Sequence, residues 1–110
     1  MSAGWVPEAG EVVWIRFDPQ VGREQAGHRP AVVLTPAAYN GRSGLLLGVP
    51  LTTRPKGYPF EVPIAGLRSG VALVDHMKSL DWKMRGATAK GRVTDKELEA
   101  IRALAKKLIG

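Results

Sequence analysis

The chain has 110 residues, 45% of them hydrophobic, which is enough for one small core and predicts a single domain over 1–110. Sixteen Lys and Arg against ten Asp and Glu give a net charge of +6 and an isoelectric point near 10.1, typical of proteins that bind nucleic acid or acidic peptides. The absence of Cys excludes disulfides and thiolate catalysis, and two separated His predict no metal and no other cofactor. Without a signal-peptide pattern or an apolar run of membrane-spanning length, we expect a soluble, cytoplasmic protein.

The first half of the chain predicts two strands joined by a long loop. Residues 11–18 alternate in polarity, with Trp14 and Arg16 on a mixed face, which indicates a strand of an antiparallel sheet. The segment 18–28 begins with a Pro-containing turn and is predicted to be a loop. Residues 29–35 are apolar on both faces, as in a central strand.

The second half predicts a series of short strands and one helix. Residues 36–44 are rich in turn signals, with room for a single helical turn. Because Pro50 cannot donate to a sheet ladder, we expect a bulge or an edge there. Thr94 and Glu97 form a capping-box pattern at the start of a helix that runs toward Gly110. Further strands are predicted at 45–53, 60–64, 71–75, 77–80 and 88–93.

The predicted elements together define the fold class. Short strands with turn signals at regular intervals and one terminal helix indicate a mainly β protein, a small closed barrel or a sandwich. The expected apolar face of the helix comprises Leu98, Ile101, Leu104, Ala105 and Leu108.

One stretch concentrates side chains that can perform chemistry. Residues 24–30, Glu-Gln-Ala-Gly-His-Arg-Pro, bring a carboxylate, an imidazole and a guanidinium to the start of a buried strand. With Pro-Leu-Thr-Thr at 50–53, Lys-Gly-Tyr-Pro-Phe-Glu-Val at 56–62 and Val-Ala-Leu-Val-Asp at 71–75, the chain resembles the MazF/PemK/Kid family of mRNA endoribonuclease toxins. This resemblance implies an SH3-like small barrel of the CcdB/PemK type with a C-terminal helix.

The resemblance also implies an activity and partners. Family members are toxins of type II toxin-antitoxin systems that cut single-stranded mRNA at short, ACA-type motifs without a metal and so arrest translation. The ribose 2′-hydroxyl attacks the adjacent phosphate, which leaves a 2′,3′-cyclic phosphate and a 5′-hydroxyl. A MazE-like antitoxin and a homodimer are the expected protein partners.

Four residues are candidates for catalysis. Arg29 either grips a phosphate with its two-pronged guanidinium or pairs with a carboxylate, Glu24 or Asp18, and the resemblance favours the catalytic role. A Thr in a strand ordinarily packs or bonds a neighbour, but Thr52 matches the second residue of the family's active pair. The Glu24 carboxylate is a candidate general base, a candidate acceptor for the amino group of an RNA base, or a solvated charge. The imidazole of His28 suits proton transfer near neutral pH, although a lone His is more often structural.

Further residues are candidates for RNA contacts. A basic stretch, 78–92, contains one acidic residue, Asp81, and resembles a nucleic-acid-facing edge. A stacking role is possible for Trp82, but all three Trp are expected in the core or an interface. The candidate RNA-binding residues are Gln25, Thr53, Lys56, Lys78 and Arg85.

Two other functions remain open from the sequence. One is a non-catalytic SH3-like module that binds nucleic acid or an acidic peptide. The other is a CcdB-like poison of DNA gyrase. Because neither function requires an Arg and Thr pair beside the 24–28 loop, Arg29 and Thr52 discriminate between them and a nuclease.

Overall fold

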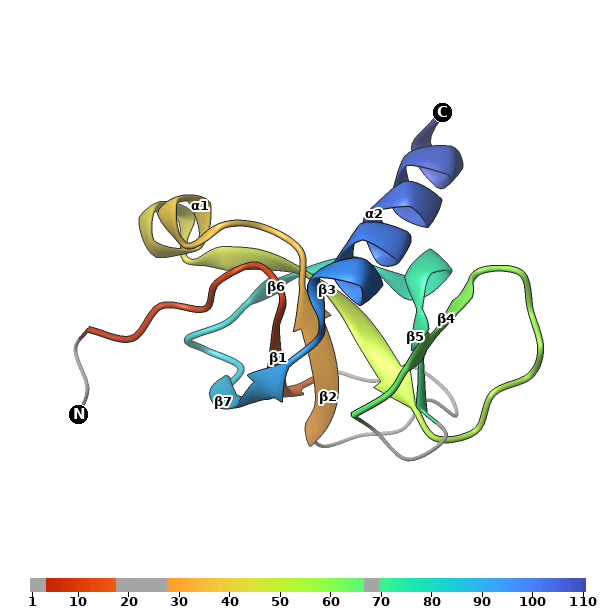
Figure 1. Cartoon of the computed structure of the whole chain (residues 1–110). Coiled ribbons are helices and arrows are strands. Elements are labelled where there is room, and N and C mark those ends of the chain that lie inside the picture. The colour runs from red at the N-terminus through yellow and green to blue at the C-terminus, as the bar shows by residue number, and fades with distance from the viewer. Residues whose placement is uncertain (1–3, 18–27, 67–69) are drawn as a thin grey trace.

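The computed structural model describes residues 4–17, 28–66 and 70–110 (Figure 1). Antiparallel strands form one curved sheet in the order β4-β5-β3-β2-β1-β7, and β6 also pairs with β3. The elements are β1 (Glu11–Arg16), β2 (His28–Val33), α1 (Ala37–Ser43), β3 (Leu45–Thr52), β4 (Glu61–Ile64), β5 (Gly70–Leu73), the 3-10 helix η1 (Val74–His76), β6 (Lys78–Asp81), β7 (Thr88–Arg92) and α2 (Asp95–Ile109).

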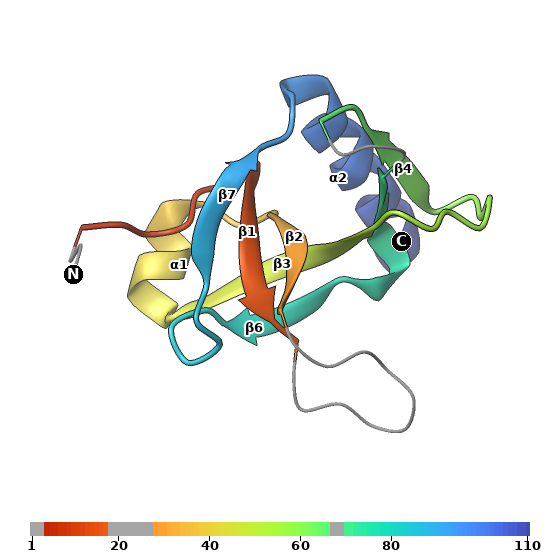
Figure 2. The same ribbon diagram turned by 90° about the horizontal axis from the view of Figure 1, so that it is seen from below.

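The sheet is buried on both faces, so it has two cores. Alternating residues of β2 point to opposite sides, and Val32 and Val33 are both fully buried. One core joins the sheet to α2 through Ile101 and Ala105, and the other is closed by Trp82. Figure 2 shows α1 and α2 on opposite sides of the curved strands. The result is a half-barrel with a C-terminal helix, as expected for the fold class, rather than a fully closed barrel.

Pro50 lies inside a regular pairing and not at a bulge. It is opposite Ala31 in the ladder between β2 and β3. On the other edge of β3, pairing with β6 ends at Gly48 and pairing with β5 begins at Leu51. The missing N–H of Pro50 therefore falls where this edge of β3 changes partner, which is the kind of position that a strand Pro can occupy.

The segment 36–44 is more helical than its turn signals predict. It contains the seven-residue helix α1, which ends at Gly44 in the left-handed conformation (φ 77°). The buried side chain of Asn40 donates to the carbonyls of Pro7 (2.8 Å) and Thr35 (2.9 Å) and accepts from the Thr35 hydroxyl (2.6 Å). The hydrogen bond to Pro7 joins residues far apart in the sequence, so a local pattern cannot reveal this support for a helix over a turn.

Helix α2 begins as the capping pattern predicts. The Thr94 hydroxyl accepts from the Glu97 N–H (3.1 Å), and the Glu97 carboxylate accepts from the Thr94 N–H (2.9 Å). Leu98, Ile101, Leu104 and Ala105 face the core as expected, whereas Leu108 is exposed. No helix in the described part of the chain is long and apolar enough to cross a membrane.

Candidate active site

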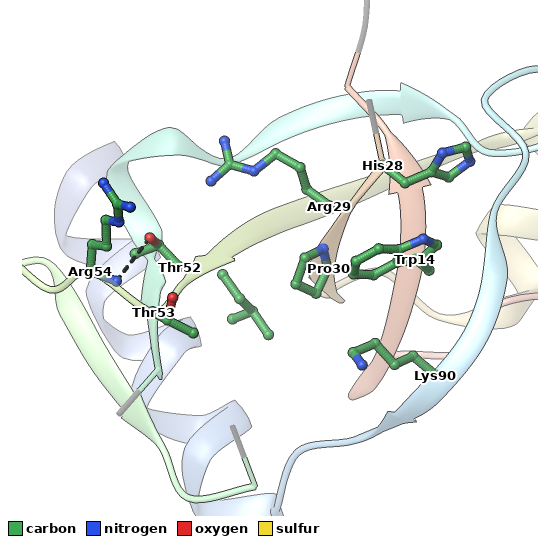
Figure 3. Close-up of a pocket in the computed structure, with 9 residues that line it drawn as sticks. Trp14, His28, Arg29, Pro30, Thr52, Thr53, Arg54 and Lys90 are labelled. Atoms are coloured by element: carbon green, nitrogen blue, oxygen red, sulfur yellow. Dashed lines mark hydrogen bonds between the residues drawn. The ribbon is translucent and has the colours of Figure 1, made fainter. Parts of the chain in front are cut away.

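A pocket of about 370 Å³ opens where β2 and β3 separate, which is within the size range of ligand-binding clefts. The paired stretch of these strands ends at Ala31 and Pro50. In the same register, Arg29 and Thr52 are level with each other two residues beyond this pair. Figure 3 shows the Arg29 side chain extending from β2 toward the wall that carries Thr52. The pocket is lined by Trp14, His28, Arg29, Pro30, Leu51, Thr52, Thr53, Arg54 and Lys90.

The charge of the pocket is positive. Arg29, Arg54 and Lys90 line it, and none of the described lining residues is acidic. Among the described residues, the half-buried Arg29 has no hydrogen-bond or ion-pair partner, so its guanidinium donors are available to a ligand. This arrangement is complementary to a phosphate group. No three His, Asp or Glu side chains within 4–17, 28–66 and 70–110 cluster as metal ligands.

The Thr52 hydroxyl is oriented by the backbone of the following turn. Its oxygen accepts a hydrogen bond from the Arg54 N–H at 3.1 Å (Figure 3). Because this bond uses an acceptor site and leaves the O–H proton, the hydroxyl can donate to an oxygen in the pocket. The next turn is held by Glu61, whose carboxylate accepts from the N–H groups of Lys56 (2.9 Å) and Gly57 (3.0 Å). The segment that carries Thr52 and Arg54 is therefore held by strand β3 at one end and by the Glu61 carboxylate at the other.

His28 and Trp14 form the opposite wall. Their rings are nearly parallel, with an interplanar angle of 13° and 6.5 Å between centroids, the range of an offset pair. Lys90 places its Nζ 5.4 Å from the Trp14 ring centroid. Figure 3 shows this aromatic wall facing Thr52, Thr53 and Arg54 across the pocket, with Arg29 and Pro30 between. The site thus combines an anion-binding side and an aromatic side.

The structure brings some of the candidate residues together and leaves others apart. Arg29, Thr52, His28 and Thr53 all line the pocket. Lys56 is exposed in the turn that Glu61 fastens. Lys78 does not line the pocket and lies with its Nζ 6.0 Å from the Phe17 ring, and Arg85 donates to the Arg16 carbonyl (3.2 Å). Glu24 and Gln25 lie outside the described residues.

Five lining residues were not among the predicted site residues: Trp14, Pro30, Leu51, Arg54 and Lys90. Of these, Lys90 lies in the basic stretch 78–92 that was expected to face nucleic acid. Trp14 was expected in the core or an interface, and the structure excludes the core, since the residue is 41% exposed. Its position on the mixed face of 11–18 was the available signal. Trp82 is a core residue: it is buried, donates its Nε1–H to the Asn40 carbonyl (2.9 Å) and packs edge-on against Trp5.

Comparison with known proteins identifies the family. A family model described as "PemK-like, MazF-like toxin of type II toxin-antitoxin system" matches residues 8–109. The chain belongs to this family. The MazF-like chain is 54% identical over 111 aligned residues to "Endoribonuclease toxin MazF" of Escherichia coli K12, with all of both proteins covered. It is 35% identical to "Endoribonuclease PemK" of Escherichia coli, over 80% of this chain and 71% of PemK.

Solved structures support the same assignment for this MazF-like chain. The crystal structure of MazF (Form-I) from Deinococcus radiodurans superposes with a TM-score of 0.89 and 49% identity, over 96% of this chain and 98% of that one. MazF in the MazE-MazF complex (Form-II) from the same organism gives 0.87 and 49%, over 96% and 97%. These similarities confirm the expected family, the mainly β MazF-like fold and the enzyme class, an endoribonuclease toxin.

Proposed function

We propose that this chain cuts single-stranded mRNA at a short, ACA-type motif without a metal ion and thereby arrests translation. The observation that carries the proposal is that Arg29 and Thr52 line the same positively charged pocket. Neither a passive nucleic-acid module nor a gyrase poison needs an oriented hydroxyl beside this guanidinium, which has no partner among the described residues. The endoribonuclease relatives support the same reading.

The chemistry follows from what the pocket can donate. The ribose 2′-oxygen attacks the adjacent phosphorus and loses its proton, while the bond from phosphorus to the 5′-oxygen breaks and that oxygen gains a proton. Arg29 and the Thr52 hydroxyl donate to the phosphate oxygens, on which charge develops. His28, at the rim, and Glu24, in the preceding segment, are the candidates for proton transfer. The products are a 2′,3′-cyclic phosphate and a 5′-hydroxyl.

The proposal is tested by cleavage of a long single-stranded RNA in EDTA, with the new ends mapped by sequencing. Wild-type protein should cut at one shared short motif, whereas Arg29→Ala and Thr52→Ala should lose cleavage. Removal of one donor to a developing oxyanion typically lowers kcat about 10²–10³-fold. Arg42→Ala is the matched control, because Arg42 is an exposed Arg of α1 that does not line the pocket.

The outcomes separate the candidate functions. Tight binding of intact RNA would indicate the non-catalytic module. Neither binding nor cutting would direct attention to protein targets such as gyrase. If wild type cuts the RNA and Arg29→Ala cuts it equally well, the role assigned to Arg29 is wrong.

The same proposal includes two protein partners. We expect the chain to form a homodimer in the cytoplasm and to be inhibited by a MazE-like antitoxin, as the MazE-MazF complexes of Deinococcus radiodurans suggest. An acidic antitoxin segment is electrostatically complementary to the pocket formed by Arg29, Arg54 and Lys90. Size-exclusion chromatography with light scattering, with and without the antitoxin, measures both assemblies.

A further inference from the structure

Among the exposed large apolar side chains in the described part of the chain, Trp14 is the one that lines the pocket. Of the three Trp, Trp82 is buried and Trp5 is partly buried against it, whereas 41% of the Trp14 side chain is exposed. Leaving so much aromatic surface in water forgoes part of the free energy that its burial would give. Because aromatic side chains commonly line ligand pockets, an exposed Trp in this pocket is a candidate ligand contact.

The backbone of Trp14 is fixed in the sheet, and its indole presents groups that a ligand can use. Trp14 lies in the middle of β1, paired with Pro30 of β2 on one edge and Thr88 of β7 on the other. Within the described residues, its Nε1–H has no acceptor. The His28 ring is offset, with its centroid 6.5 Å away, and Lys90 Nζ lies 5.4 Å from the ring centroid. Neither side chain covers the indole fully, since Trp14 is 41% exposed. A flat ring beside cations is the combination with which proteins bind single-stranded nucleic acid.

The position of the ring relative to the phosphate site determines what it can bind. Trp14 lines the same pocket as Arg29 and Thr52 and forms the wall opposite Thr52 and Arg54. The pocket of about 370 Å³ leaves room for the base of a nucleotide whose phosphate is held by Arg29 and Thr52. We propose that the Trp14 indole stacks on an unpaired base next to the phosphate that is cut.

This inference rests on the proposed endoribonuclease function and refines how its substrate is selected. A base inside a duplex has both faces covered by its neighbours, so only an unpaired, unstacked base can lie against Trp14. Every base has a π-face, and stacking is tolerant of sequence. Trp14 therefore provides affinity and selection for single strands, while the cleavage motif is read by other groups.

Binding of a short, fluorescently labelled single-stranded RNA tests the proposal independently of cleavage. The RNA contains one mapped cut site with a 2′-O-methyl ribose, which prevents cutting. Trp14→Leu, which keeps apolar volume but removes the flat face, should raise the Kd roughly ten-fold. Trp14→Phe should remain near wild type. Tyr39→Leu is the matched control, an aromatic residue of similar exposure, 45%, on α1.

A base-deletion series distinguishes stacking from a structural role. A series of RNAs is made in which each member has one abasic ribose near the cut. Trp14→Leu should bind roughly ten-fold more weakly than wild type to every member except one. With the RNA that lacks the stacked base, wild type and variant should bind equally. An unchanged Kd in Trp14→Leu, or an equal loss with every abasic RNA, would overturn the proposal. A shift of Trp14→Leu to monomers in light scattering would also overturn it, because the indole would then pack against a second copy. If no RNA is cut and no site can be mapped, the same Kd comparison is made with an unmodified single-stranded RNA. Weaker binding by Trp14→Leu in that case would support stacking, and only the endoribonuclease proposal would fail.

Discussion

The fold orients the side chain of Thr52 more than that of Arg29. The Thr52 hydroxyl is oriented, because the Arg54 N–H fills one of its acceptor sites. Arg29 has a fixed backbone in β2 but a free guanidinium in the described structure. Preorganised donors contribute most to electrostatic catalysis, since they need no rearrangement as charge develops. The Thr52 hydroxyl is thus the more preorganised donor of the pair.

Isosteric substitution at Thr52 tests this role. Thr52→Val preserves the shape and removes the donor, so we expect kcat to fall about 10²–10³-fold. Thr52→Ser retains the hydroxyl and should stay active. Cleavage rates of a mapped RNA site, together with thermal unfolding, provide the measurement. Full activity of Thr52→Val would show that the hydroxyl has no part in the chemistry.

Sequence patterns predicted the polar half of the site but not its aromatic half. Arg29, Thr52, Thr53 and His28 were identified from residue type and resemblance, and all line one pocket. Trp14 was expected in the core or an interface, because Trp is highly buried on average. Strand alternation had already placed it beside Arg16 on the mixed face, so periodicity was a better guide than residue type.

At the scale of elements, local signals succeeded where local contacts dominate. The strands and α2 follow from alternation and from the Thr94–Glu97 capping box. The extent of α1 was missed because Asn40 is held by the distant Pro7 carbonyl. The pocket itself depends on the separation of β2 and β3, which is a property of strand pairing and has no local sequence pattern.

Glu97 links α2 to the end of the β4 segment. Its carboxylate caps the helix and also accepts from the Ala65 N–H at 2.7 Å. Burial acts to raise the pKa of Glu97, but the hydrogen bonds from Ala65 and Thr94 outweigh it and lower the pKa below its usual value. A carboxyl whose pKa is lower in the folded than in the unfolded state stabilises the folded state at pH values above its unfolded-state pKa. This contribution is lost as the pH falls through the folded-state pKa.

Glu97→Gln should therefore destabilise the protein in a pH-dependent way. We expect a loss of about 1 kcal/mol in the free energy of unfolding at neutral pH, because hydrogen bonds to an ionised carboxylate are stronger than those to a neutral amide. The difference from wild type should shrink in acid, where Glu97 is itself neutral. Urea unfolding at both pH values measures it, with Glu99→Gln, an exposed site on the same helix, as the control. A pH-independent difference would contradict the role of the charge.

For the molecule as a whole, the excess of positive charge contributes to RNA binding where cationic side chains contact phosphate groups. The net charge is +6, and three cationic side chains line the pocket. Phosphate contacts release counterions from RNA, so they make binding depend on salt. The distribution of these contacts can be measured without a structure of the complex.

Removal of a pocket cation should change the salt dependence of RNA binding. For Lys90→Ala, we expect the slope of log K against log salt concentration to decrease in magnitude by about 0.7, the value for one single-strand phosphate contact. Lys96→Ala, at an exposed position on α2, should leave the slope unchanged. Equal slopes for wild type and Lys90→Ala would show that Lys90 contacts no phosphate.

The claim that the 2′-hydroxyl is the nucleophile can be tested with a single atom of the substrate. After the cut site is mapped, the RNA is remade with a 2′-deoxyribose at the nucleotide 5′ to the cut and incubated with wild-type protein in EDTA. We predict that this RNA still binds in the pocket of Arg29 and Thr52 but is not cut, whereas the unmodified RNA yields a 2′,3′-cyclic phosphate. Cleavage of the deoxy-substituted RNA at the same position would contradict the account, because another nucleophile would then have to attack the phosphate.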